Sequence, residues 1–147
     1  MPVDLMETTD LIEPWIYQSI SGDQELVDSV YGLDHISMTL SLDEPSVPYV
    51  HVSLSDSRDI MGVGGRRLAV DALYLIKVVD ATASWDDLKV ARGRINALFN
   101  RPGEVFTLPN GSLTSIRDRI IQYPEKVEGI QFRHIGGIWR IRASFDD

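Results

Sequence analysis

The segment RRLAVDALYLIKVVD, residues 66–80, is the longest strand candidate in the chain, and both of its faces are largely apolar. Alternate residues of an extended strand lie on opposite faces. One face would carry Leu68, Val70, Ala72, Tyr74, Ile76 and Val78, and the other Ala69, Asp71, Leu73, Leu75, Lys77 and Val79. A strand that is apolar on both faces is covered on both sides. We therefore expect this strand to lie at the centre of a sheet or to be covered by a neighbouring subunit.

Shorter strand patterns lie on both sides of this segment. Residues 35–42 alternate weakly between apolar and polar side chains, and residues 47–56 alternate well. Residues 104–115 predict a hairpin with its turn at Asn110-Gly111, a dipeptide that favours two-residue hairpin turns. Strands joined by turns this short pair in the antiparallel sense.

The last third of the chain continues the strand pattern. Residues 116–126 predict a strand that ends at Pro124, because proline cannot donate a backbone hydrogen bond. Residues 129–145 predict two strands joined by a two-residue turn at Gly136-Gly137. The sheet would then contain about four to six strands.

Three segments predict helices. Residues 11–22 place isoleucines on one stripe, with Glu13-Pro14 at the expected start, and residues 23–32 offer a short second helix capped by Asp23. Residues 84–100 carry a clear apolar stripe that ends at the sequence NRPG. The order of elements predicts an α+β domain, in which an antiparallel sheet of about four to six strands carries two to three helices on one face.

Length and composition place few restrictions on function. A chain of 147 residues suits a single domain, residues 1–147, in which we expect residues 1–8 to be flexible and residues 55–67 to form a mobile loop. The absence of cysteine excludes disulfides, thiolate zinc sites and cysteine nucleophiles. No apolar run is long enough for a membrane span, and the acidic start lacks the basic residues of a signal peptide. A net charge of −8 argues against sequence-specific binding of nucleic acid.

The glycine-rich stretch DSRDIMGVGGRRLAV, residues 56–70, does not match a nucleotide-binding loop. A dinucleotide site needs a third glycine where Arg67 stands and a helix after it, and a P-loop needs lysine and a hydroxyl residue after its last glycine. We interpret the stretch as an assembly arm, because long connections between strands are often functional and apolar tips suit protein docking. Its candidate contact residues are Arg58, Met61, Gly62, Val63, Gly64, Gly65, Arg66 and Arg67.

The remaining polar residues give no catalytic or metal-binding pattern. His35, His51 and His134 have no second histidine at ligand spacing, and no serine lies in a Gly-x-Ser-x-Gly elbow. The adjacent acidic pairs, such as Asp86-Asp87, point apart on a strand or serve a helix start. We therefore expect no catalytic residue, no cofactor and no metal, and predict that the protein is not an enzyme.

Arginines gather in the last third of the chain, at Arg117, Arg119, Arg133, Arg140 and Arg142. One interpretation is a solvated sheet face with paired acids, and a second is a charged interface that matches an acidic surface on a neighbouring subunit. Contact with DNA is a third. In the expected final hairpin Arg133 would lie across the turn from Arg140, and Trp139 would be either an interface anchor or a core residue.

Four segments together resemble the tail terminator, or tail completion, proteins of long-tailed bacteriophages. These segments are PYVHVSL, MGVGGRRLAVDALYLIKVV, WDDLKVARGRINALF and GIQFRHIGGIWRIRASF. The similarity spans Leu11 to Phe145 and is strongest over Met61 to Phe99 and Ile130 to Ile141. The chain departs from many relatives in its insert PGEVFTLPNGSLTSIRDRIIQYP.

The resemblance implies a virion structural protein at the junction of tail and neck, assembled in the host cytoplasm. Such proteins form a ring, usually of six copies, on the head-proximal end of the tail tube. The ring stops growth of the tube and then binds the neck or head-completion protein. DNA passes through the lumen without sequence-specific binding. Another neck component, a small ligand-binding or enzymatic domain, and an interaction module of unrelated function remain as alternatives.

Overall fold

The computed structural model describes residues 6–38, 46–65, 67–82 and 84–145. Its helices are α1 (Thr8–Ser21), α2 (Gln24–Ser29) and α3 (Lys89–Phe99), with short 3-10 turns η2 (Leu33–His35) and η3 (Trp85–Leu88). Its strands are β1 (Ile36–Ser37), β2 (Tyr49–Met61), β3 (Arg67–Asp80), β4 (Phe106–Leu108), β5 (Gly111–Val127) and β6 (Ile130–Phe145).

The strands form one six-stranded sheet in the order β1-β2-β3-β6-β5-β4. All neighbours pair in the antiparallel sense except β1, which runs parallel to β2 over two residues. The long strand β3 is central, between β2 and β6, as its two apolar faces predict. The expected α+β class, strand number and helix number are therefore confirmed.

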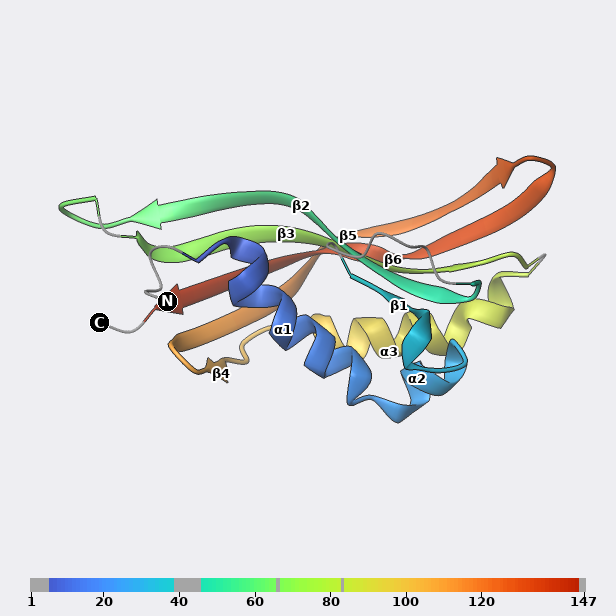
Figure 1. Ribbon diagram of the computed structural model, residues 1–147, viewed down its shortest axis with the longest axis horizontal. Coiled ribbons are helices and arrows are strands. Elements are labelled where there is room, and N and C mark those ends of the chain that lie inside the picture. Colours follow the sequence, from blue (N-terminus) through green and yellow to red (C-terminus); the bar gives the residue numbers. More distant parts are fainter. Residues whose placement is uncertain (1–5, 39–45, 66, 83, 146–147) are drawn as a thin grey trace.

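The three helices cover one face of the sheet, and the other face is left open (Figure 1). From β3 the side chains of Val70, Ala72, Tyr74, Ile76 and Val78 point into the layer between sheet and helices, where they are fully buried. They pack against the isoleucines of α1 and the apolar stripe of α3. A buried hydrogen bond from the Tyr74 hydroxyl to Glu13 Oε2, 3.2 Å long, ties β3 to α1. Burial of the ring and the nearby Glu13 carboxylate raise the pKa of Tyr74.

Helix α1 begins earlier than Pro14 predicted. Glu7 and Asp10 form a reciprocal capping box at its start, so Pro14 lies inside the helix. Thr8 is buried, and its hydroxyl lies 2.6 Å from that of Ser57 on β2. Thr8 is thus the first residue of α1, at the end of the stretch that we expected to be flexible; residues 1–5 lie outside the described residues.

Helix α2 is held to α3 at its first turn. The Asp23 side chain accepts a hydrogen bond from the Leu26 amide, as expected of a cap. It also forms a bidentate ion pair with Arg94 of α3, in which the shortest N–O distance is 2.6 Å. Burial alone would raise the pKa of Asp23, but the hydrogen bonds from Arg94 and Leu26 outweigh it and lower that pKa.

The prediction of a turn at Gly136-Gly137 is wrong. Strand β6 runs without a break through both glycines, because they lie where the neighbouring strands approach closely: a Cβ on Gly136 would collide with the backbone at Ile76 and Lys77. The turn lies instead at Glu128-Gly129, where both residues have positive φ (50° and 82°), as a two-residue hairpin turn requires. Strand β5 also continues past Pro124 to Val127. Because β4 pairs only with residues 111–113 of β5, the rest of β5 is an edge of the sheet, and Pro124 needs no ladder donor on that side.

Candidate assembly surfaces

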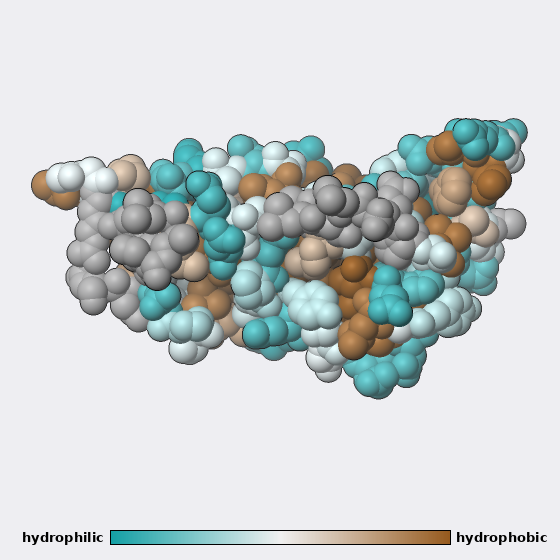
Figure 2. Space-filling view, viewed as in Figure 1, coloured by the Kyte–Doolittle hydropathy of each residue, from teal (hydrophilic) through white to brown (hydrophobic). Residues whose placement is uncertain are grey.

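Two hairpins extend from opposite ends of the sheet (Figure 1). The β2–β3 hairpin ends in the turn around Val63, and the β5–β6 hairpin forms an arm that ends at Glu128-Gly129 and curls above the open face. Apolar surface is visible at both ends of the molecule (Figure 2). Val63 is fully exposed and Met61 half-exposed at the first end, and Val127 and Ile130 are exposed at the second.

The β2–β3 connection is shorter than the expected loop over residues 55–67. Strand β2 continues to Met61, which pairs with Arg67 of β3, so the connection is confined to the residues between them, of which 62–65 are described. Gly64 and Gly65 have φ values of 84° and 80°, which side chains rarely adopt. Gly64 and Gly65 thus allow the chain to turn without backbone strain. The mobility of this segment and its role in assembly stay predictions.

The arginines of this stretch differ from one another. Arg58 is exposed on β2, whereas the Arg67 side chain is mostly buried. Arg67 donates to the Met6 carbonyl at 2.7 Å, pairs with Asp59 at 3.5 Å and lies over the Phe145 ring. These contacts fix the start of α1 to the sheet, and a role of Arg67 in assembly stays a prediction. Arg66 lies outside the described residues.

Four arginines surround two carboxylates on the open face, and we call this set the arginine patch: Arg58, Arg119, Arg140 and Arg142. Asp71, almost completely buried, lies at its centre. Its Oδ2 atom is 3.7 Å from Arg58, 3.0 Å from Arg140 and 3.3 Å from Arg142. Asp118 pairs with Arg140 at 3.5 Å and with Arg119 at 3.3 Å.

Arg140 was expected as an assembly contact from its place among the arginines, but the two acids that position it, Asp71 and Asp118, were not. The sequence could have indicated a special role for Asp71, because it is an isolated charge within an apolar strand. Asp118 lies at a β-bulge between Arg117 and Arg119, which no local pattern indicated. This bulge also corrects the expectation that Arg117 and Arg119 share a face: Arg117 pairs with Trp139 on the helix side, and Arg119 with Ile138 on the open side.

Arg133 and Trp139 do not lie on the open face. Because β6 is a single strand, Arg133 and Arg140 are on opposite faces of it, which corrects the expected pairing across a turn. Arg133 donates to the Thr82 carbonyl at 3.1 Å and lies 4.7 Å from the centre of the Trp85 ring. Trp139 is 1% exposed and donates to the Ile76 carbonyl at 3.2 Å. Trp139 is thus a core residue in this chain, so of the two expectations stated for it the core one is confirmed.

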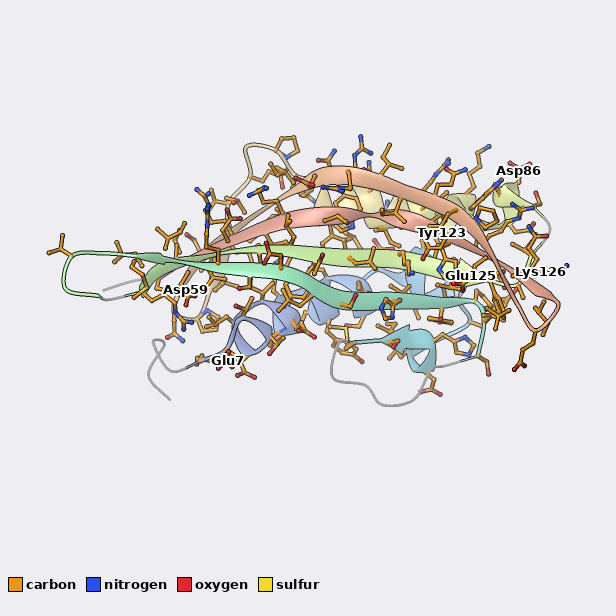
Figure 3. The ribbon with its side chains drawn as sticks, turned by 90° about the horizontal axis from the view of Figure 1, so that it is seen from above. Glu7, Asp59, Asp86, Tyr123, Glu125 and Lys126 are labelled. Atoms are coloured by element: carbon orange, nitrogen blue, oxygen red, sulfur yellow. The ribbon has the colours of Figure 1, made fainter. Side chains whose placement is uncertain are left out.

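A groove of about 630 Å³ lies on the open face beneath the β5–β6 arm. The buried Lys77 donates a hydrogen bond to the Tyr123 hydroxyl at 2.8 Å. The Tyr123 ring stacks on the His134 ring, with 4.4 Å between the two ring centres. His134 Nε2 lies 3.2 Å from Glu125 Oε1. Figure 3 shows Tyr123 and Glu125 at the end of the sheet away from Asp59. These contacts hold the arm against β3.

The charge state of His134 follows from this packing. Burial and the nearby Lys77 ammonium lower its pKa below the ordinary value, and the Glu125 carboxylate offsets only part of that shift. Nδ1 is buried without a hydrogen-bond partner among the described residues. The imidazole is therefore neutral at pH 7 and acts as a packing surface for Tyr123.

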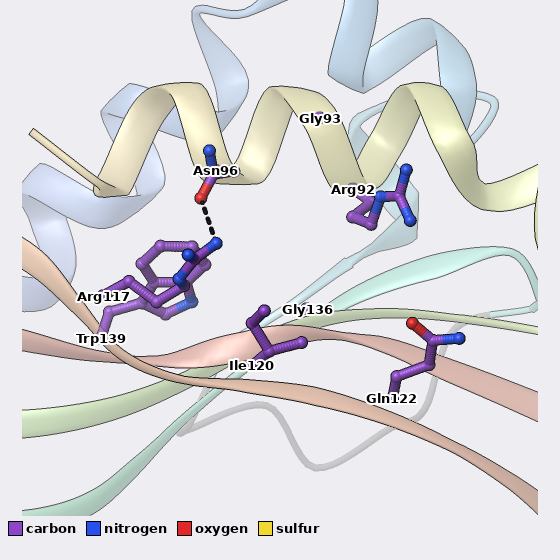
Figure 4. Close-up of a pocket in the computed structure, with 8 residues that line it drawn as sticks. All are labelled: Arg92, Gly93, Asn96, Arg117, Ile120, Gln122, Gly136 and Trp139. Atoms are coloured by element: carbon purple, nitrogen blue, oxygen red, sulfur yellow. Dashed lines mark hydrogen bonds between the residues drawn. The ribbon is translucent and has the colours of Figure 1, made fainter.

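A second cleft, of about 300 Å³, separates α3 from β5 and β6 (Figure 4). Arg117 donates to the Asn96 side chain across it at 3.1 Å, and Trp139 lies behind this pair. Arg92 and Gln122 line its open end. The lining offers hydrogen-bond donors but no carboxylate, histidine or hydroxyl nucleophile, so it supplies no pair for acid–base or covalent chemistry.

Among residues 6–38, 46–65, 67–82 and 84–145, no group of three or more metal-ligating side chains could hold a metal ion. Within the same ranges, no helix has the length and apolar character to cross a membrane.

Comparison with known proteins shows the fold. No family model and no curated protein matches the chain. A chain of the "Virion of native gene transfer agent (GTA) particle" superimposes with a TM-score of 0.60 and 18% identity, over 92% of this chain and 96% of that one. A second solved structure, whose name describes no function, gives a TM-score of 0.61 and 13% identity over 97% and 99% of the two chains. The architecture described above is therefore shared with both proteins over nearly their whole length.

Proposed function

We propose that the protein is a structural component of a phage-type virion, and that it caps the head-proximal end of the tail tube as a ring of six copies. The observation that carries this proposal is the fold shared with a chain of a gene transfer agent virion, which covers 92% of this chain. The sequence resemblance to tail terminators independently points to the same kind of particle.

The surface of the chain supports an assembly role. Apolar residues lie at the tips of both hairpins, and the charged residues of the open face neutralise one another only in part. Exposed apolar tips and arginine clusters are typical of protein interfaces. The two hairpins extend from opposite ends of the sheet, so the tip of one copy can contact a different surface of the next copy. Such a contact between unlike surfaces is heterologous, and heterologous contacts form a ring when the rotation between copies closes.

In this role one face of the ring binds the last ring of tube protein and the other binds the neck or head-completion protein. DNA passes through the lumen without sequence-specific contacts, and a net charge of −8 suits a surface past which DNA must move. The protein would then reside at the junction of tail and neck after assembly in the host cytoplasm, without a catalytic step or cofactor.

The test is growth of tail tubes from purified tube protein of the same virus, with and without this protein. We expect added protein to stop elongation, so that electron micrographs show shorter tubes with a density at one end only. A variant in which residues 62–65 are replaced by a two-residue turn should keep the monomer fold and lose this effect. Tubes of unchanged length and bare ends would overturn the proposal.

A further inference from the structure

The charges of the chain are segregated along its sequence. All 14 lysines and arginines stand at or after Arg58, whereas half of the 22 acidic residues precede it. The segment before Arg58 builds α1, α2, η2, β1 and most of β2, and arginines from β5 and β6 complete the arginine patch. The molecule therefore carries negative charge on its first two helices and positive charge on part of its open face.

The arginine patch keeps a positive surplus. Its four guanidiniums share the two carboxylates of Asp71 and Asp118, and the exposed Asp56, two residues before Arg58 on the same face of β2, offsets one further charge. The side chains of Arg58 and Arg119 are 75% and 65% exposed. A guanidinium has five N–H donors, and each of these pairs occupies only one or two of them. Ile116, exposed beside Arg140 on the neighbouring strand, adds an apolar contact to the patch.

An acidic knob stands on the opposite side of the molecule, where α2 leads into η2 (Figure 1). We define it by Glu25, Asp28, Tyr31, Leu33 and Asp34, all of which are exposed. Tyr31 is 77% exposed and Leu33 50%, so two large apolar side chains project among three carboxylates. Tyrosine and arginine are the residues that most often dominate the energy of protein interfaces.

The backbone at Tyr31 gives a second reason to regard the knob as a functional surface. Tyr31 has a φ of 66° at the end of α2, the left-handed position where helices usually place glycine. A side chain is strained in this conformation, and glycine is present only at the next position, Gly32. The fold thus retains an exposed aromatic ring where a smaller residue would be less strained.

We propose that the arginine patch of one copy binds the acidic knob of a second copy. Carboxylates of the knob would occupy the unused guanidinium donors, and Tyr31 and Leu33 would pack near Ile116. Because the patch and the knob are different surfaces on opposite sides of the chain, the contact is heterologous and allows a ring. This inference rests on the proposed function only in taking the ring as the assembly that the contact builds.

The charge of the protein favours a second copy over nucleic acid as the occupant of the patch. The net charge of −8 repels a phosphate backbone as a whole, and the surplus of the patch is small beside it. A second copy also carries a net charge of −8, but it presents a compact cluster of exposed carboxylates, with Tyr31 and Leu33 among them, that matches the patch at short range.

A charge-reversal experiment on the full chain tests the proposal. We would measure the self-association constant by analytical ultracentrifugation for the wild type, for the patch variant Arg58→Glu/Arg119→Glu and for the knob variant Glu25→Lys/Asp28→Lys. We expect each variant to associate at least about tenfold more weakly, and an equimolar mixture of the two to associate again as a heteromeric pair. Arg92→Glu, a reversal at an exposed site on α3 outside the patch, the knob and both hairpin tips, is the matched control and should associate like the wild type.

A third variant addresses stability. Tyr31→Gly should keep or raise the melting temperature, because it relieves the left-handed strain, and should still weaken association. Wild-type association should also weaken between 0.05 and 0.5 M salt, roughly as the screening length shortens. Variants that associate like the wild type, a mixture that does not recover, or a wild type that stays monomeric at about 100 µM would overturn the inference. So would reversals that change only binding to DNA.

The two proposals fail in distinguishable ways. Salt-dependent association that the mixture restores, together with tubes of unchanged length, would retain the contact and reject the terminator function. Shortened tubes together with reversals that have no effect on self-association would retain the terminator function and reject this contact.

Discussion

Gly136 lies directly opposite Lys77 in the pairing of β6 with β3, and a side chain on Gly136 would collide with the backbone of β3. The close approach brings the two strands together beneath the β5–β6 arm. It also explains why a Gly-Gly pair, which usually marks a turn, stands in the middle of a 16-residue strand.

Replacing this glycine should therefore destabilise the protein. We expect Gly136→Ala to lower the free energy of unfolding by about 2 kcal/mol or more, because the strands must move apart to admit the methyl group. Gly93→Ala is the matched control, since a Cβ at Gly93 on α3 meets open space. It should raise that free energy by about 0.5–1 kcal/mol through helix propensity. Urea unfolding followed by circular dichroism measures both, and equal stabilities would contradict the account.

The stability of the protein should depend on pH through His134. Burial and Lys77 lower the pKa of His134 in the fold, so below about pH 6.5 the unfolded chain binds a proton that the folded chain does not. The free energy of unfolding should then fall as the pH decreases from about 6.5 toward the folded-state pKa. His134→Gln should remove this part of the slope. A wild type and variant with parallel pH profiles between pH 5 and 8 would contradict the assignment.

Asp71 should stabilise the fold by holding the arginine patch together. We expect Asp71→Asn to lower the free energy of unfolding by about 2 kcal/mol, because three guanidiniums lose the negative charge of the acceptor that they share. The patch should also lose its order, so self-association should weaken even under conditions where the variant is folded. Glu104→Gln, which removes the charge of an exposed ion pair with Arg101 away from the patch, provides the control. Thermal unfolding that leaves both variants equal would show that the buried carboxylate is not needed.

A substitution in the β2–β3 turn should impair assembly without changing the stability of the monomer. Val63 is fully exposed, so Val63→Asp should leave the melting temperature within about 1 °C of the wild type. The same change places a charge on the apolar tip and should reduce the fraction of tubes that carry a cap. Val105→Asp, at another exposed valine, serves as the control in the same electron micrographs. Equal capping by both variants would exclude a contact at the tip.

Much of the fold could be predicted from periodicity. The two apolar faces of residues 68–79 correctly indicated a central strand, and the apolar stripe of residues 84–100 correctly indicated a helix. These predictions succeed because burial acts on every second or every third to fourth residue of a long segment, so many positions agree.

The predictions that failed depend on contacts between distant residues. A glycine in a strand pattern indicates either a turn or a close approach of two backbones. Only the pairing of β6 with β3 shows that Gly136 lies at a close approach. The bulge at Asp118 likewise follows from tertiary packing, and it moves Arg119 to the face opposite Arg117. Asp71 could be found as an isolated charge in an apolar strand, but its three arginine partners come from two other strands.

A ring of six copies at one end of the tail tube can be examined by counting the copies bound at that end. The chain has no cysteine, so Lys89→Cys, at an exposed site on α3, allows one dye per copy. Photobleaching steps would be counted on tubes grown with the labelled protein. We predict about six steps, all at a single end of each tube, as a closed six-membered ring requires. Labels scattered along the tubes, or tubes without labels, would contradict the account.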